Sequence, residues 1–340
     1  MKPLEPPGSV NLRKPIRRIL ARCAVAAVAA LSTQAAWSQE YPTRPISLVV
    51  PFTAGGPTDI VARALSVPMS KFLGQSVVVE NKPGAGGTLS AIHVSRAQPN
   101  GYTFLIHHNG MATAPALYRK LKYNPLTDFE FVGQVVDVPM TLLGRKDLPA
   151  ENFDQLLAWL KEQGDKVNLA HAGLGAVSQL CGLLFRKATG VEVTTVPYQG
   201  AGPALVALLG GHVDLLCDQT TQTMPHIKAG AVKLYGVTTL ERVRNLPDTP
   251  TLDELGLKGF EVKVWHGIYA PKKTPPEIIA KFNEALRFAL KDPDFVRRMG
   301  ELDAEIVPEE KQTPEGLRRW LQKETDRWGP IIRDAGVYAD

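Results

Sequence analysis

Apolar residues recur with two different periods along the chain, and the two periods alternate. Short runs rich in β-branched residues, at 46–51 and 76–80, predict buried strands. Between them, residues 59–73 repeat apolar positions at helical spacing and predict an amphipathic helix, which Pro68 should kink and Gly74 should end. Strands that alternate with helices predict an α/β fold with a mainly parallel sheet flanked by helices.

The alternation continues toward the end of the chain. We expect a strand at 131–143 that contains Pro139 and passes between two domains. Residues 274–277 have the form of a capping box, and Thr313 precedes a proline and a glutamate, so both stretches predict helix starts. Other strands are expected at 102–106, 167–170, 193–197, 213–217 and 234–237, and other helices near 88–97, 153–160 and 180–188.

The glycine-rich turn 51–59 joins the first strand to the first helix. Gly55 and Gly56 carry no Cβ, so the backbone there can approach a ligand closely. Thr58 or Asp59 can cap the helix, whose first N–H groups and dipole favour an anion. Our hypothesis is that this turn binds a carboxylate. The alternative is a turn that needs glycine only for its geometry.

Further turns with glycine or polar residues follow other predicted strands. In parallel sheets, ligands bind beyond the carboxyl ends of the strands, so these turns define the expected binding region. They lie at 81–87, 107–109, 171–178, 198–203 and 218–221.

The first 38 residues have the three parts of an export signal. A basic stretch ends at Arg17-Arg18, an apolar stretch covers 23–31, and small residues precede a cleavage position before Gln39. We predict a signal peptide over 1–38 and a periplasmic location, with the general secretory and twin-arginine routes both open. No later apolar run is long enough to span a membrane, so we expect the mature chain to be soluble.

The charge of the mature chain is balanced. The leader carries six basic residues and one acidic residue, so the remainder has 33 basic and 33 acidic residues. This balance gives no global bias toward nucleic acid. Two cysteines follow the leader, Cys181 and Cys217, and the sequence leaves open whether they form a disulfide or two buried thiols.

Motifs for several kinds of chemistry are missing from the sequence. Residues 84–87 lack the glycine spacing of a dinucleotide site, and neither a G-x-S-x-G nor an H-E-x-x-H stretch occurs. His107 and His108 are adjacent in a strand-end region, where neighbouring side chains point apart, so we expect no metal site and no cofactor. No spacing pairs Asp59, Asp214 and Asp218 as catalytic carboxylates. The pattern therefore favours a binding protein over an enzyme.

At these same turns the chain resembles a known family, the solute-binding receptors of tripartite tricarboxylate transporters, also called Bug receptors. The resemblance spans nearly the whole mature chain in the order of the family. The matching stretches are Tyr41-Pro42 with Pro45, 51–59 followed by Arg63, 79–87, 99–103, 196–200 and 246–251.

The resemblance implies a two-domain periplasmic binding protein fold of type II, with 41–139 and 267–340 forming domain 1 and 140–266 forming domain 2. It implies an exported, monomeric, non-enzymatic receptor that captures a small carboxylate between the domains and delivers it to membrane transporter subunits. The hinge should lie near 138–139 and 265–269. Carried onto this sequence, the ligand-binding residues are Thr53, Ala54, Gly55, Gly56, Asp59, His107, His108, Asn109, Gly173, Gly175, Ala176, Ser178, Gly200, Gly202 and Asp218.

Three points stay open from the sequence. The family often has a hydroxyl residue where this chain has Ala176, and Ser178 or the backbone would have to replace it. A dicarboxylate, a tricarboxylate and an aromatic carboxylate all fit the resemblance as ligands. The alternative functions are a sensor that presents its ligand to a signalling partner and, less favoured, an exported enzyme acting on a carboxylate.

Overall fold

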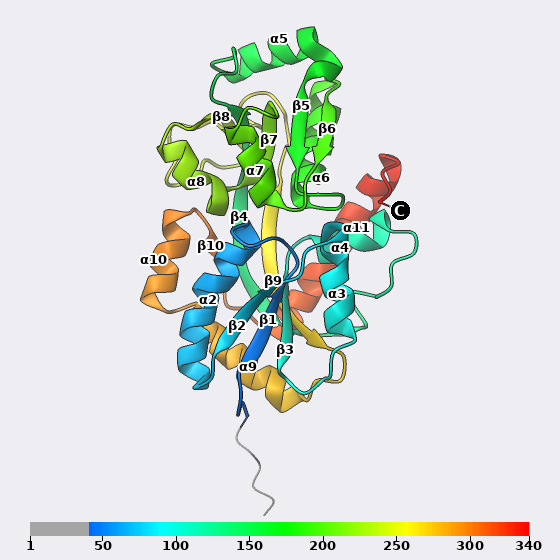
Figure 1. The fold of residues 1–340 in the computed structure, drawn as a ribbon, viewed down its shortest axis with the longest axis vertical. Helices are drawn as coiled ribbons and strands as arrows, with labels where there is room; N and C mark the ends of the chain where they lie inside the picture. Colours follow the sequence, from blue (N-terminus) through cyan, green and yellow to red (C-terminus); the bar gives the residue numbers. More distant parts are fainter. Residues whose placement is uncertain (1–40, 340) are drawn as a thin grey trace, which may run out of the picture. The chain divides into compact units, whose positions relative to one another are not determined.

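One long strand connects the two halves of the sheet in this computed structural model, which describes residues 41–339. The first part of β4 (Phe129–Arg145) pairs antiparallel with β9 (Lys263–Pro271), and its last residues, from Met140, pair with two other strands (Figure 1). The strand expected at 131–143 is therefore confirmed and is longer than predicted. The predicted signal peptide, 1–38, lies outside the described residues.

The first half of the sheet has the order β2-β1-β3-β9-β4. β1 pairs in parallel with both β2 and β3, β9 runs antiparallel to its neighbours, and β10 adds a short edge to β4. Figure 1 shows α2 on one side of these strands and α3 and α4 on the other. The elements are β1 (Ile46–Val50), α2 (Pro57–Leu73), β2 (Val77–Asn81), η1 (Ala85–Gly87), α3 (Thr88–Ser95), β3 (Thr103–His107), α4 (Gly110–Leu117), α9 (Pro276–Ala289), α10 (Pro293–Glu301), β10 (Glu305–Ile306) and α11 (Pro314–Asp334).

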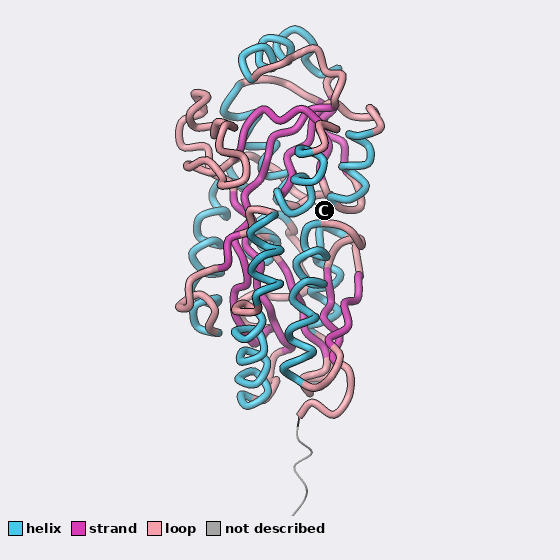
Figure 2. Tube along the Cα trace, turned by 90° about the vertical axis from the view of Figure 1, so that its left-hand side faces the viewer, coloured by secondary structure: helices cyan, strands magenta, loops and turns pink. Residues whose placement is uncertain are grey.

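The second half continues from β4 with the order β7-β5-β6, and β8 also pairs with β4. β5 is parallel to β6 and β7, whereas β7 and β8 run antiparallel to β4. Helices accompany the strands in both halves (Figure 2). The elements are α5 (Phe153–Gln163), η2 (Gly164–Lys166), β5 (Asn168–His171), α6 (Val177–Thr189), β6 (Thr194–Pro197), α7 (Ala201–Leu209), β7 (Leu215–Gln219), α8 (Thr220–Lys228) and β8 (Val232–Val237).

Each half has its own buried apolar cluster. One cluster includes Trp265 and Tyr269 from β9, and the other includes Leu143 from β4 and Leu216 from β7. Phe104 is fully buried and stacks on Phe282 with 3.6 Å between ring centroids, so it belongs to the core. No helix among the described residues is long and apolar enough to cross a membrane.

Two of the predicted helix caps are wrong. The residue before α2 is Gly56, and neither Thr58 nor Asp59 caps that helix, because they are its second and third residues. The hydroxyl of Thr274 donates to the carbonyl of Pro271, so α9 starts without a side-chain cap. Thr313 does cap α11, since its hydroxyl accepts a hydrogen bond from the Gly316 N–H at 3.0 Å.

The open question about the cysteines has an answer. Cys181 in α6 and Cys217 in β7 form a disulfide, with 6.2 Å between their Cα atoms. Both side chains are buried. The bond fastens the helix that follows the turn 171–178 to the strand that carries Asp218.

Candidate functional site

A small cavity lies where strands from both halves of the sheet end. We call it the cleft cavity, and its volume is about 20 Å³, which is enough for roughly one water molecule. It lies beyond the carboxyl ends of β1, β3, β5 and β7, where ligands bind in sheets of this kind. The residues around it are Phe52, Pro57, Thr58, His108, Met140, Ala172, Ala176, Val177, Ser178, Ala201, Asp218 and Gln219.

Four helices begin at this cavity. Its lining includes the first residues of α2, α6 and α7, and Gln219, the N-cap residue of α8. None of these four helices has a side chain that caps its first turn. The lining residues, all within the described part of the chain, include no lysine or arginine. Positive helix-dipole ends favour an anion even where no basic side chain is present.

The Asp59 carboxylate stabilises the turn 51–59 through three hydrogen bonds. Its carboxylate accepts the Gly55 N–H at 2.9 Å, the Arg63 Nε–H at 2.8 Å and the Asn81 side-chain N–H at 2.9 Å. Burial opposes ionisation of Asp59, but the hydrogen bonds from Arg63, Gly55 and Asn81 hold its pKa below the ordinary value. Asp59 lies outside the lining of the cleft cavity, so it shapes the turn from a buried position.

Side chains already occupy several N–H groups of the second turn, 171–178. The Ala172 N–H donates to Ser178 Oγ at 2.9 Å, and the Gly175 N–H donates to Gln179 Oε1 at 2.6 Å. The Gly173 N–H donates to His171 Nδ1 at 3.2 Å. Gly173 and Gly175 both have positive φ, so they make the turn possible without facing the cleft cavity. The donors left for an anion there are the first N–H groups of α6.

Gly200 and Gly202 bring the start of α7 against the first turn. A Cβ on Gly200 would lie 2.6 Å from Thr53 Oγ1, and one on Gly202 would lie 3.8 Å from the Ala54 carbonyl oxygen. A side chain at Gly200 would therefore keep the two turns apart. The Thr53 hydroxyl is buried and has no hydrogen-bond partner among the described residues.

His107, the last residue of β3, and the two residues after it, His108 and Asn109, have different surroundings. His108 lines the cleft cavity and stacks on Phe52 with 4.7 Å between ring centroids. Burial, reinforced by His107 and His266, holds the pKa of His108 well below 6.5, so its ring is neutral at pH 7. The Asn109 side chain hydrogen-bonds to the backbone of Lys263 and Trp265 in β9, and neither Asn109 nor His107 lines the cleft cavity.

Asp218 contributes a carboxyl group to the same cavity. Its side chain is buried, and Oδ2 has no hydrogen-bond partner among the described residues. Burial raises the pKa of Asp218 to about 7, although the backbone N–H of Gln219 opposes the shift.

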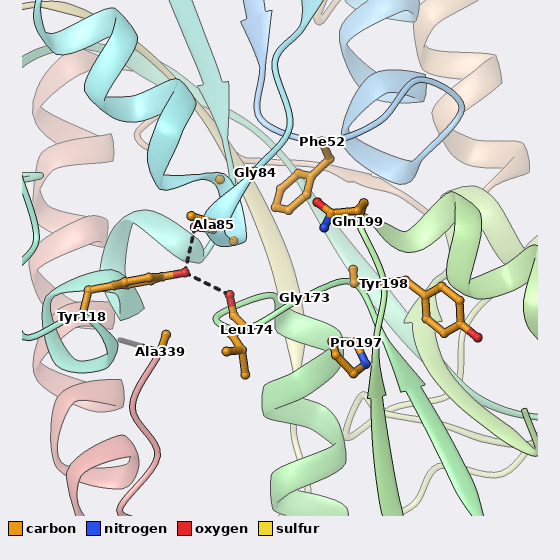
Figure 3. A pocket seen from close by; sticks show the side chains of 13 residues that line it. Phe52, Gly84, Ala85, Tyr118, Gly173, Leu174, Pro197, Tyr198, Gln199 and Ala339 are labelled. Carbon is orange, nitrogen blue, oxygen red and sulfur yellow. Dashed lines mark hydrogen bonds between the residues drawn. The ribbon is translucent and has the colours of Figure 1, made fainter.

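A larger cavity adjoins the first. This outer cavity has a volume of about 260 Å³ and shares Phe52 and Ala172 with the cleft cavity. Figure 3 shows the Tyr118 hydroxyl between the carbonyl oxygens of Ala85, at 2.7 Å, and Leu174, at 3.3 Å. Tyr118 thereby links the turn 84–87 to the turn 171–178.

The predicted site residues thus divide into three sets. His108, Ala176, Ser178 and Asp218 line the cleft cavity. Thr53, Gly56, Gly200 and Gly202 meet where the first turn contacts α7; Ala54 and Gly55 complete that turn, and Gly173 lines the outer cavity. Asp59, His107, Asn109 and Gly175 lie outside both linings.

Sequence reasoning missed several lining residues. Phe52 and Thr58 lie inside the motif that was singled out, but neither glycine geometry nor charge marked them as lining residues. Tyr118 lines the outer cavity without any sequence signal, and Gln199 lines it from a turn that the sequence had marked without singling out this residue. Among the described residues, no group of three or more histidine, cysteine, aspartate or glutamate residues is placed to hold a metal ion.

Comparison with known proteins gives a consistent result. The sequence profile of the "Tripartite tricarboxylate transporter family receptor" matches residues 61–337. The UPF0065 protein in the TAR-I ttuE-ttuC' intergenic region of Agrobacterium vitis is 48% identical over 296 residues, which are 87% of this chain and 86% of that protein.

Solved structures extend the similarity to the fold. The periplasmic binding protein BugD is 50% identical, with a TM-score of 0.86 over 88% of this chain and 99% of that one. MatC from Rhodopseudomonas palustris, solved with bound malate, is 41% identical, with a TM-score of 0.83 over 86% of this chain and 100% of that one. An R. palustris protein solved with adipate is 34% identical, with a TM-score of 0.83 over 88% and 99% of the two chains. The chain therefore belongs to the receptor family of tripartite tricarboxylate transporters, the Bug receptors, and has the fold of a periplasmic binding protein.

Proposed function

We propose that this chain is an exported receptor that captures a small carboxylate at the cleft cavity and delivers it to a membrane transporter of the tripartite tricarboxylate type. The observation that carries the proposal is the convergence of four uncapped helix starts on one cavity whose lining has no basic side chain. Such a site binds an anion through backbone N–H groups and helix dipoles.

The carboxylate of the ligand would accept hydrogen bonds from backbone N–H groups in the first turns of α2 and α6. Thr58, Val177 and Ser178 supply backbone N–H groups at helix positions that have no partner within the helix. Charge-assisted hydrogen bonds of this kind contribute roughly 1.5–3 kcal/mol each. Neutral donors also avoid the desolvation of a buried cation, which would cost several kcal/mol.

Ligand entry would require the two halves of the sheet to separate. A cavity of about 20 Å³ is too small for a four-carbon diacid. We assign domain 1 to 41–139 with 267–340 and domain 2 to 140–266. A hinge at 138–139 and 265–269 is supported by β4, which exchanges β9 for β7 and β8 as partners between Pro139 and Met140.

The ligand is proposed to be a dicarboxylate. Relatives have been solved with malate and with adipate, which differ in length. The outer cavity, which shares Phe52 and Ala172 with the cleft cavity, offers room for a longer chain. Tricarboxylates and aromatic carboxylates would use the same space. We propose that the receptor works as a periplasmic monomer and binds its ligand without turnover.

The test is isothermal titration of the folded, ligand-stripped protein with dicarboxylates, tricarboxylates and aromatic carboxylates. A matched pair of variants links binding to the cavity. Gly202→Ala adds a Cβ in ordinary contact, whereas the branched side chain of Gly202→Val pushes against the first turn. We expect Gly202→Val to lower affinity at least about tenfold and Gly202→Ala to change it little. If Gly202→Val binds the ligand with wild-type affinity, the ligand does not bind at the cleft cavity, and the proposal is wrong on this point.

A further inference from the structure

Asp218 is a buried carboxyl group that the described part of the chain does not neutralise. Its side chain is 1% exposed, it lines the cleft cavity, and its Oδ2 atom has no hydrogen-bond partner among the described residues. The other lining residues include no lysine or arginine, and the His108 ring carries no charge at pH 7. An unpaired buried carboxylate is costly, so its presence in a binding cavity indicates a function.

The surrounding hydrogen bonds do not explain the carboxyl group. The Thr141 hydroxyl lies 3.1 Å from Asp218 but donates to its backbone carbonyl. The Ser178 hydroxyl accepts a hydrogen bond from the Ala172 N–H at 2.9 Å, and no hydrogen bond between the described residues Ser178 and Asp218 is found. Beside Asp218, the Oε1 atom of Gln219 also lacks a partner among the described residues and lines the same cavity. Two acceptors therefore lie together where hydrogen-bond donors are missing.

The two parts of the cavity favour opposite kinds of ligand group. The helix starts offer N–H donors and favour a carboxylate, whereas Asp218 and Gln219 offer acceptors and favour a donor. A second carboxylate against an ionised Asp218 would be repelled. A ligand that satisfies both parts carries a carboxylate and, close to it, a hydroxyl or ammonium group.

We propose that Asp218 is a specificity-determining residue that selects carboxylates bearing a hydroxyl or ammonium group on the carbon chain. The inference rests on the proposed receptor function and names the ligand class of that site. Burial raises the pKa of Asp218 to about 7 although the backbone N–H of Gln219 opposes the shift, and a donor on the ligand would supply the partner that Oδ2 lacks.

The experiment compares ligands that differ only beside the carboxylate. Affinities are measured by titration calorimetry at pH 8 in three matched sets: succinate, malate and aspartate; propionate, lactate and alanine; phenylacetate, mandelate and phenylglycine. In each set that binds, we expect the hydroxyl or ammonium member to bind at least about tenfold more tightly than the unsubstituted acid, as a charge-assisted hydrogen bond predicts.

Two substitutions assign that preference to Asp218. Asp218→Ala should bring the members of a set to within about threefold of each other, because the acceptor is lost. Asp218→Asn keeps an acceptor without the charge, so it should retain a preference for the hydroxyl member and abolish one for the ammonium member. Asp154→Asn, an exposed carboxylate in the first turn of α5, is the control and should behave like the wild type. Thermal melting shows that each variant is folded.

Two results would overturn the inference. One is an unsubstituted acid that binds the wild type as tightly as both of its substituted partners. The other is a preference that survives in folded Asp218→Ala. If no member of any set binds the folded, ligand-stripped wild type, the carboxylate receptor proposal fails, and the inference fails with it.

Discussion

Helix starts among the described residues are of two kinds, with and without a side-chain cap, and every one that has such a cap lies away from the cleft cavity. Asn152, Asp292 and Thr313 cap α5, α10 and α11 with side-chain oxygens, and none of these three residues lines the cleft cavity. The four helices that begin at the cavity have no side-chain cap, and neither do α3, α4 and α9.

The helices that begin at the cleft cavity lack the stability that a side-chain cap would give them. A side-chain cap typically stabilises a helix by about 1 kcal/mol, and it does so by using the N–H groups that an anion would accept. Four uncapped starts therefore leave donors available at a cost in stability. A cap added at the cavity should therefore lower ligand affinity, whereas a cap deleted elsewhere should lower only the stability of the fold.

The largest effect should come from removing the covalent support of an uncapped helix. The double variant Cys181→Ser with Cys217→Ser removes the disulfide that holds α6 to β7 across a sequence separation of 36 residues. Chain-entropy arguments predict a loss of about 4 kcal/mol in the free energy of unfolding. Denaturant unfolding under oxidising conditions measures the loss. A change below about 1 kcal/mol would show that packing alone holds α6.

The second effect concerns the carboxyl group already present at the cavity. Asp218 has a folded-state pKa of about 7 against 3.8 for the unfolded chain, so the folded protein binds more protons between these values and loses stability as pH rises from 4 to 7. Asp218→Asn cannot ionise and should be more stable than the wild type at pH 8, by on the order of 4 kcal/mol, and nearly equal to it at pH 4.

Unfolding of both proteins across this pH range measures the difference. The buried histidines His107, His108 and His266 have lowered pKa values, so they stabilise the fold at neutral pH and lose that contribution as pH falls. They are present in both proteins, so their contribution cancels in the comparison. A difference that does not depend on pH would contradict the assigned ionisation.

The third experiment adds a cap at the cavity. Ala176 is the N-cap residue of α6, and Ala176→Asp would place a carboxylate on the first-turn N–H groups that we assign to the ligand. Affinity for the ligand should fall about 100-fold, because the new group takes the donors and repels the ligand, while the helix start gains stability. Ala176→Asn is the neutral control and should lose less affinity. Equal affinities for the two variants would show that charge repulsion does not contribute to the loss of affinity.

The smallest effect should come from deleting a cap elsewhere. Thr313→Ala removes the hydroxyl that accepts the Gly316 N–H at the start of α11. The free energy of unfolding should fall by about 1 kcal/mol, with ligand affinity unchanged after correction for folding. Thermal melting and calorimetry on the same samples test both statements. An altered affinity would mean that α11 is coupled to the cleft.

The fold could be predicted from the sequence because its strands are short β-branched runs ended by glycine turns. The strands at 46–51 and 76–80 were found in this way, and the start of the last helix was found from the proline and glutamate that follow Thr313. α4 was missed because it begins with a glycine and contains Pro115, and α10 was missed because its nine residues are too few to establish a helical period in the sequence.

The candidate site was predictable only as a set of turns. Asp59 has the residue type and position of a cap, yet tertiary contacts with Arg63 and Asn81 make it a brace behind the turn. Asn109 follows a strand as a ligand residue would, but β9, which is distant in sequence, takes its side chain. The disulfide and the meeting of four helix starts depend on long-range packing, which sequence spacing does not record.

The order of strands also has a consequence for how the chain is made. β9 lies between β3 and β4, although more than a hundred residues separate it from either strand along the chain. Until the ribosome has delivered β9, the facing edges of β3 and β4 are unpaired, and unpaired edges invite association with other chains. Non-local pairing of this kind also slows folding. A chain truncated before residue 263 would therefore have an unfinished first half with two open edges.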